Sequence, residues 1–199
     1  TQIISAVLAG CMMASVLPVS AFALETGADV ENGVNAQAEA VTKIEDPGTD
    51  YIISEPGVYS MEGTYAHRVI INTDGDVTIH VTGNIDYTNA SKTGNVALWQ
   101  VVKVNELTIE NENQYTVQTT VSGIGGPQLL REEYNAQINK ITVNGGIYKH
   151  VGGNSVFQFS SGGKADLKNV TVEGSSNSAV YSNRSCEVTI TGGKYTTGY

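Results

Sequence analysis

The carboxylates best placed to hold a metal ion lie in one short stretch, Thr73-Asp74-Gly75-Asp76. Hard cations such as Ca²⁺ take several oxygen ligands, mostly from Asp and Glu. A lyase acting on a uronate polymer would use calcium held in this way, with an Arg or Lys removing the proton beside the uronate carboxyl group. The same four residues also have the composition of a tight turn between strands, which is the interpretation we favour. Calcium is therefore the one cofactor that this stretch suggests.

The arginines and histidines show no spacing typical of a catalytic or metal-binding motif, and the chain has no nucleophile signature. The two cysteines are Cys11 and Cys186, and we expect Cys186 to pack as a small core residue. This pattern leans against an enzyme, although folding could still bring distant residues together. The residues concerned are Arg68, Arg131, Arg184, His67, His80 and His150.

Aromatic side chains offer a different chemistry, because their rings can stack on the C–H face of a sugar while polar neighbours bind its hydroxyl groups. A polysaccharide is thus the expected partner of this chain. The alternative is that about half of these aromatic residues pack in or against the body of the protein. The residues predicted to bind carbohydrate are Trp99, Tyr148, His150, Tyr181, Arg184 and Tyr195.

The elements that would position these residues repeat along the chain. Five times the sequence places a polar residue, an aliphatic residue, Thr and another aliphatic residue in a row, and most copies are soon followed by Gly or Asn. The intervals between the threonines are 30, 34, 29 and 18 residues. Such repeats, built from β-branched segments and tight turns, predict an all-β chain folded as a parallel β-helix, a solenoid with one repeat per coil. The threonines are Thr78, Thr108, Thr142, Thr171 and Thr189.

Alternation along these strands predicts which side chains enter the core. The aliphatic residues that flank each Thr should stack from coil to coil, about 4.8 Å apart. The threonines then form an outward column, which we attribute to strand propensity and Thr–Thr pairing. The helix-capable stretch 127–137 is expected to be a loop that leaves one coil. A second outward column, of mixed chemistry, would contain His80, Glu110, Asn144, Glu173 and Thr191.

The first 50 residues differ from the rest in charge and hydropathy. Residues 1–23 carry no charge and end in Ala21-Phe22-Ala23, which predicts a signal peptide whose basic start is missing. An uncleaved anchor, or lipidation at Cys11, are the alternatives, and each of them also exports the chain. Residues 24–50 hold seven acidic side chains and one basic, hence a charge of −6, and are expected to form a disordered linker.

The β-helix domain is expected to occupy residues 51–199. Because the chain stops within a repeat, we expect this domain to be incomplete and to continue in a longer protein. The net charge of the whole chain is −9, with no basic patch, which argues against nucleic acid as a partner. Apart from the export signal no membrane contact is expected, and the sequence makes no prediction about oligomeric state.

The order of signals in residues 52–117 resembles the opening coils of secreted bacterial carbohydrate-binding domains with a pectate-lyase-like right-handed β-helix. Gly57-Val58-Tyr59, Gly63 and the stretch from Val77 to Gly83 carry the resemblance, together with the five repeats. The resemblance implies a right-handed helix and binding of acidic or cellulosic plant polysaccharides, often with calcium. No calcium-ligand cluster of this chain matches that family.

The sequence therefore predicts a bacterial protein, secreted or held at the cell surface, that binds carbohydrate without catalysis. One alternative is a structural or adhesive stalk whose β-helix displays other domains. A second alternative is a polysaccharide lyase or hydrolase, which would need a carboxylate cluster with Arg or Lys in one groove.

Overall fold

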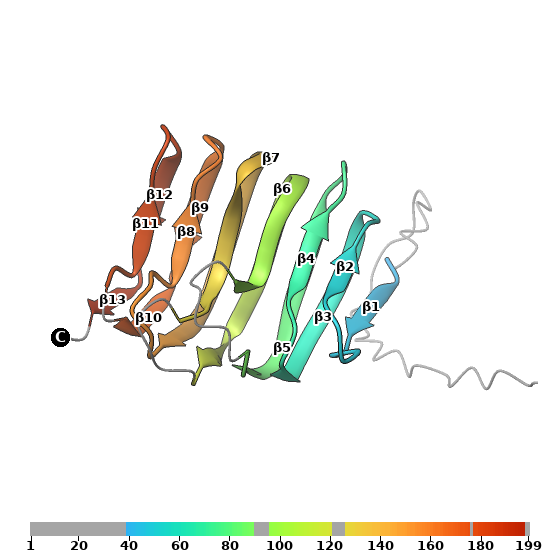
Figure 1. The fold of residues 1–199 in the computed structure, drawn as a ribbon, viewed down its shortest axis with the longest axis horizontal. Coiled ribbons are helices and arrows are strands. Elements are labelled where there is room, and N and C mark those ends of the chain that lie inside the picture. The colour runs from blue at the N-terminus through green and yellow to red at the C-terminus, as the bar shows by residue number, and fades with distance from the viewer. Residues whose placement is uncertain (1–38, 90–95, 121–125, 176, 198–199) are drawn as a thin grey trace, which may run out of the picture. The chain divides into compact units, whose positions relative to one another are not determined.

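The computed structural model describes residues 39–89, 96–120, 126–175 and 177–197. All regular secondary structure in these ranges is β-strand, and the thirteen strands belong to one sheet system (Figure 1). The strands are β1 (Val41–Ile44), β2 (Tyr51–Ile53), β3 (Gly57–Tyr65), β4 (Val69–Asn72), β5 (Val77–Tyr87), β6 (Ala97–Thr119), β7 (Gln128–His150), β8 (Phe157–Phe159), β9 (Lys164–Lys168), β10 (Thr171–Ser175), β11 (Val180–Ser182), β12 (Glu187–Thr191) and β13 (Lys194–Thr197).

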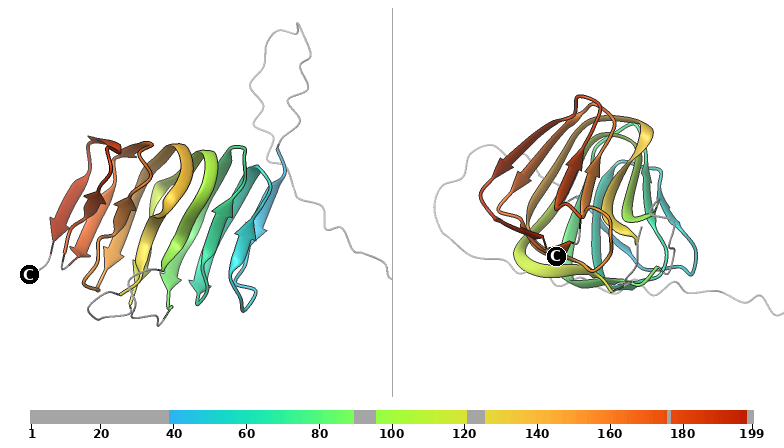
Figure 2. Two further views of the ribbon diagram at one scale, coloured as in Figure 1. Left: turned by 45° about the horizontal axis from the view of Figure 1, so that its top comes forward. Right: turned by 60° about the vertical axis from the view of Figure 1, so that its left-hand side comes forward.

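Every strand pairing is parallel, and the pairings form three ladders. Ladder A runs β2–β4–β6–β7–β8–β11, and ladder B runs β1–β3–β5–β6–β7–β9–β12. Ladder C joins the final segments of β3, β5, β6 and β7 to β10 and β13. The long strands β6 and β7 bend and so enter all three ladders. This confirms the all-β, parallel part of the prediction, and the stacked turns in Figure 2 are consistent with a solenoid.

The core is made of aliphatic columns that follow the ladders. In ladder B, Val77 pairs with Leu107, Leu107 with Ile141, and Ile141 with Ala165, and all four side chains are buried. The neighbouring inward column contains Tyr59, Ile79 and Ile109 and continues in the same register. Burying one such side chain contributes about 1.5–3 kcal/mol, so each coil is stabilised by its neighbours. The alternation predicted from the sequence is confirmed for these strands.

The fourth copy of the repeat was placed wrongly by the sequence pattern. Thr78, Thr108 and Thr142 do form a column, but the next residue in it is Asp166 of β9, followed by Thr189. Thr171 belongs to β10 in ladder C, where it pairs with Ile147. Accordingly Lys168, and not Glu173, continues the second outward column. The coil after β7 is shorter than its predecessors, and the motif of β9 has Asp in place of Thr.

The stretch 127–137 is not a loop, which corrects a second expectation. β7 begins at Gln128, and Leu130 pairs with Trp99 in the core of ladder A. Within this stretch, only residues 133–136 interrupt the register between β6 and β7. Burial of the two leucines at 129 and 130 therefore outweighs the helix propensity of the residues that follow.

The expected linker is also wrong over residues 41–50. β1 pairs with β3, Ile44 is fully buried, and the Tyr65 hydroxyl donates to the Ile44 carbonyl at 2.6 Å. The average composition of residues 24–50 does not indicate this strand, because β1 has only two apolar residues and its neighbours in the sequence are acidic. The rest of the linker and the expected signal peptide lie in residues 1–38, outside the described residues.

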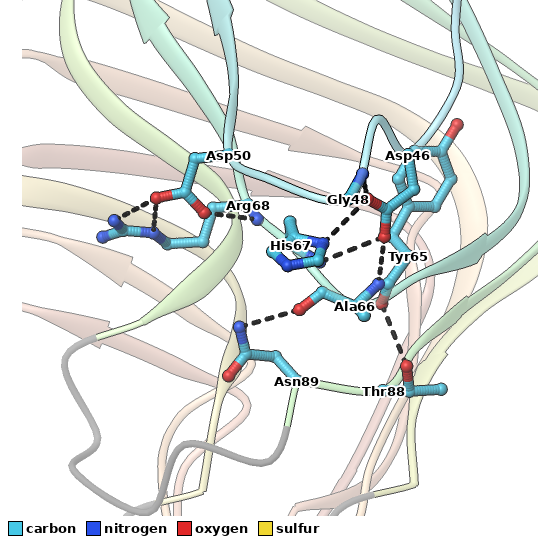
Figure 3. Close-up of polar contacts among 9 residues, drawn as sticks. All are labelled: Asp46, Gly48, Asp50, Tyr65, Ala66, His67, Arg68, Thr88 and Asn89. Atoms are coloured by element: carbon cyan, nitrogen blue, oxygen red, sulfur yellow. Dashed lines mark hydrogen bonds and ion pairs between the residues drawn. The ribbon is translucent and has the colours of Figure 1, made fainter.

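Two aspartates of residues 45–50 bind the turn that joins β3 to β4 (Figure 3). Asp46 accepts hydrogen bonds from the Ala66 and His67 backbone N–H groups, and its Oδ1 lies 2.8 Å from His67 Nδ1. Burial raises the pKa of Asp46, but the hydrogen bonds from Ala66, Gly48 and His67 outweigh burial and leave that pKa below its usual value. This segment is therefore fastened to the sheet by specific contacts.

Candidate functional site: a groove between β5 and β6

A groove of about 550 Å³ crosses the outer surface where ladder B meets ladder C, and we call it the β5–β6 groove. Its size lies in the range of small-molecule binding sites. One wall comes from β5, and the other comes from β6 and the residues inserted at 112–115. The lining residues are Thr78, His80, Val81, Thr82, Glu110, Glu112, Asn113 and Tyr115.

The β6 wall of the groove is held by the side chain of Asn111, which is fully buried. Asn111 Nδ2 donates to the Tyr115 carbonyl at 2.9 Å, and Asn111 Oδ1 accepts from the Tyr115 backbone N–H at 2.9 Å. Gln114 takes a left-handed conformation at φ 58°, where the chain turns from ladder B into ladder C. These bonds make the wall a fixed part of the strand pair.

The next coil accommodates this turn with two glycines. A Cβ atom on Gly145 would lie 2.6 Å from the Asn111 carbonyl oxygen, and one on Gly146 would overlap Asn111 Nδ2. Both glycines also have positive φ, at 73° and 97°. Gly-Gly at this register is thus required by the close approach of the Asn111 turn.

The groove is rich in hydrogen-bond acceptors and carries no Lys or Arg among its lining residues. Glu110 is half-buried and accepts from Asn144 Nδ2 at 2.9 Å, while Glu112 is exposed. His80 is exposed and pairs in register with Glu110 across the two strands. Tyr115 packs one side against the core. The site therefore offers carboxylates, hydroxyls, one imidazole and part of an aromatic ring.

Three of the residues predicted to bind carbohydrate are buried, which corrects that prediction. Trp99 and Tyr148 are fully buried with their rings edge-to-face at 6.5 Å, and Trp99 Nε1 donates to Met61 Sδ at 3.2 Å. His150 is 1% exposed, and its Nε2 lies 2.7 Å from the Pro127 carbonyl oxygen. None of these rings can stack on a sugar. They fill the interior because large inward residues on neighbouring coils meet there.

The other three predicted residues lie nearer the surface but form no common site with the buried ones. Tyr181 is exposed on the outer face of ladder A, and Tyr195 is half-buried against the core. Arg184 lies with its guanidinium 3.3 Å from the centre of the Tyr134 ring and donates to the Tyr134 carbonyl at 3.0 Å. The sequence reasoning missed Tyr134 because residues 127–137 were expected to leave the coil.

Sequence reasoning also missed the β5–β6 groove. His80 belongs to the predicted second outward column, and nothing in the alternation of β6 indicates that residues 112–115 line a groove beside it. The available signal was the Gly145-Gly146 pair, which marks the coil that must make room for an inserted turn.

The carboxylates considered for calcium have partners of their own. Asp74 forms an ion pair with Lys103, and Asp76 Oδ1 accepts from Asn105 Nδ2 at 2.6 Å and from the Glu106 backbone N–H at 3.2 Å. Residues 73–76 do form the turn between β4 and β5. Within the described ranges no three His, Cys, Asp or Glu side chains gather closely enough to hold a metal ion.

Cys186 packs against the core, as predicted. Burial, and then the nearby Glu132 carboxylate, raise the pKa of the Cys186 thiol to about 11. The thiol is therefore protonated at neutral pH and a poor nucleophile.

Comparison with protein-family models, with curated proteins and with solved structures found no match. In the part of the chain that the structure describes, no helix is long and apolar enough to cross a membrane.

Proposed function

We propose that this chain is an exported, non-catalytic carbohydrate-binding protein built on a right-handed parallel β-helix, and that the β5–β6 groove binds its ligand. The observation that carries the proposal is the groove of about 550 Å³, in which acceptor groups and one aromatic ring converge. Three parallel ladders support the helical architecture, and parallel crossovers are right-handed in nearly all proteins. The resemblance of residues 52–117 to secreted carbohydrate-binding domains points the same way.

The charges of the groove favour an uncharged polysaccharide. Sugar hydroxyls can donate to Glu110 and Glu112, and charge-assisted hydrogen bonds of this kind are stronger than neutral ones. A uronate polymer would instead bring its carboxylates close to both glutamates, with no Lys or Arg in the lining to balance them. Calcium could bridge the two sets of carboxylates, so a uronate ligand would bind only with calcium present.

A hydrolase is the less favoured function. Glycosidases use two carboxylates that flank the bond to be cleaved. Glu110 and Glu112 both come from β6, so they lie on one wall, while β5 contributes Thr78 and His80 to the other. This arrangement suits binding better than cleavage.

Export to the bacterial surface or medium follows from residues 1–23, where cleavage after Ala23 or lipidation at Cys11 would each place the domain outside the cell. Mass spectrometry of the mature protein distinguishes these two routes. A structural or adhesive stalk remains the alternative function, and it predicts no saccharide binding in the β5–β6 groove.

The test is affinity electrophoresis in gels that contain a neutral β-glucan or polygalacturonate, the latter with calcium or with a chelator. We expect the neutral glucan to retard the protein, and Glu112→Ala to weaken this at least several-fold. Glu106→Ala is the matched control, because Glu106 is an exposed glutamate of the same strand outside the groove. Equal retardation of both variants would place binding elsewhere, and no retardation in any gel would favour the stalk.

A further inference from the structure

A ladder of amide side chains runs along the corner between ladders A and B. Asn105 and Asn139 occupy the same position in successive coils, one residue before the paired Glu106 and Lys140. Asn139 Nδ2 donates to Asn105 Oδ1 at 2.6 Å, and Asn105 Nδ2 donates to Asp76 Oδ1 at 2.6 Å. The hydrogen bonds all point toward Asp76, so Asn139 Nδ2 is used within the ladder and Asn139 Oδ1 is the acceptor at its end.

The following coil has no side chain at this position. Lys140 pairs with Lys164, which brings Gly163 beside Asn139. A Cβ atom on Gly163 would lie 2.6 Å from the Ile138 carbonyl oxygen, so the backbone there approaches too closely for any other residue. The amide ladder therefore stops at Asn139, because Gly163 supplies no side chain that could continue it.

A second groove, of about 410 Å³, lies over this position, and we call it the corner groove. Gln137, Asn139 and Ser161 line it together with Gly162 and Gly163. Its charged residues, Asp74 and Lys103, neutralise each other in an ion pair. The corner groove thus offers uncharged donors and acceptors, in contrast to the acidic β5–β6 groove.

One wall of the corner groove is held in place from a distant coil. The wall includes Ala136, the last residue of the insertion at 133–136. Tyr134 in the same insertion lies against the Arg184 guanidinium, and the Arg184 carbonyl oxygen lies 3.4 Å from the Cβ position of Gly162. Arg184 therefore holds the insertion through its side chain, while its backbone passes close to Gly162. A wall held in this way reduces the entropy lost when a ligand binds.

We propose that the corner groove binds the acetamido group of an N-acetylated sugar. Such a group has the donor and acceptor of an Asn side chain and would continue the ladder from Asn139 within the corner groove. Its N–H would donate to Asn139 Oδ1, and its carbonyl would accept from Gln137 or from the Ser161 hydroxyl. A plain hydroxyl in the same place would satisfy only part of this set. The site is separate from the β5–β6 groove and does not depend on it.

The experiment is isothermal titration of the intact chain with a β-1,4-linked N-acetylglucosamine tetramer, compared with cellotetraose, which has hydroxyls in place of the acetamido groups. We expect binding of the acetylated tetramer to be at least tenfold tighter than that of cellotetraose. Asn139→Ala should weaken it roughly tenfold, as expected for the loss of about one or two hydrogen bonds. Gln137→Ala, at an exposed residue, is a second variant in case Asn139→Ala disturbs the ladder, and thermal melts check the folding of each.

Asn113→Ala is the matched control, because Asn113 is an exposed amide that lines the β5–β6 groove. Loss of binding in Asn113→Ala but not in Asn139→Ala would overturn this inference and leave the proposed function standing. Equal affinities for the two tetramers, or no binding of the acetylated one, would also overturn it. Binding that is lost only in Asn139→Ala and Gln137→Ala would support it, whatever becomes of the β5–β6 groove.

Discussion

Asp50 and Arg68 join the first coil to the second through side chain and backbone together. Arg68 Nε donates to Asp50 Oδ2 and the Arg68 backbone N–H donates to Asp50 Oδ1, each at 3.0 Å, and the second guanidinium nitrogen also contacts Oδ2 (Figure 3). Arg68 Nη1 also donates a hydrogen bond to Gln100 Oε1 of the third coil at 3.2 Å. This pair fastens a segment that composition alone assigned to a linker.

We expect Asp50→Asn to lower the free energy of unfolding by about 1–2 kcal/mol, because a partly buried guanidinium loses its charged partner. Urea unfolding followed by circular dichroism measures the change. Asp74→Asn is the control, since Asp74 also pairs with a cation but its side chain is 86% exposed, and we expect a change below about 0.5 kcal/mol there. Equal effects of the two substitutions would show that the Asp50 pair contributes no more than a surface ion pair.

The ion pair between Asp50 and Arg68 also makes the stability of the fold depend on pH. The hydrogen bond from Arg68 holds the pKa of Asp50 below its usual value of 3.8, so the unfolded chain binds this proton more readily than the folded chain. The stabilisation is complete above pH 3.8 and is lost as the pH falls through the lower folded-state pKa. Below about pH 4 the melting temperature of Asp50→Asn should approach that of the unaltered protein. A difference that persists undiminished at pH 2 would contradict this assignment.

His150 gives a second pH dependence in a higher range. Burial lowers the pKa of His150 from 6.5, so below pH 6.5 the unfolded chain takes up a proton that the folded chain resists. Stability should therefore fall as the pH decreases from 6.5 toward the folded-state pKa. The amide of His150→Gln can still donate to the Pro127 carbonyl. We therefore expect this variant to show a smaller change of melting temperature between pH 7 and pH 5. The exposed His80→Gln is the control, and a matching change in that variant would remove His150 as the cause.

Glu132 is a charged residue in a position that is otherwise apolar. It pairs in register with Val101, is fully buried, and its Oε2 accepts from the Ser160 and Ser161 backbone N–H groups at 2.6 Å each. Glu132→Ala would leave both buried N–H groups without an acceptor, so we expect a loss of about 2–4 kcal/mol in unfolding free energy. Glu132→Gln retains one carbonyl acceptor and should lose about half as much. If Glu132→Leu proved as stable as the unaltered protein, these bonds would have no net effect.

The fold could be predicted from the sequence where residues repeat at short range, and not where coils differ in length. Val77 and Ile79 alternate clearly with polar neighbours, so their inward direction and their stacking on Leu107 and Ile109 followed directly. That Thr171 lies in ladder C could not be predicted in this way, because the register depends on how many residues each turn inserts.

The candidate site was less predictable than the fold, for the same reason. The sequence predicts that Trp99 and Tyr148 bind carbohydrate, but an aromatic residue suits either a sugar or a core, and only its neighbours on adjacent coils decide between the two. The β5–β6 groove depends on an insertion that one sequence does not distinguish from ordinary strand. Arg184 is among the predicted binding residues, but the sequence does not indicate its contact with Tyr134, which lies two coils earlier.

Gly146 offers a test of how the β5–β6 groove is built. Its φ of 97° and the overlap of any Cβ with Asn111 mean that Gly146→Ala must displace the turn that forms the β6 wall of the groove. We expect Gly146→Ala to lose about 1–3 kcal/mol in stability and also to lose retardation by a neutral β-glucan. Gly48→Ala is the control, because Gly48 has a similar φ of 78° but open space around its Cβ position. That variant should lose some stability through strain alone and keep its ligand. If Gly146→Ala bound the glucan as tightly as Gly48→Ala, the Asn111 turn would not be part of the binding site.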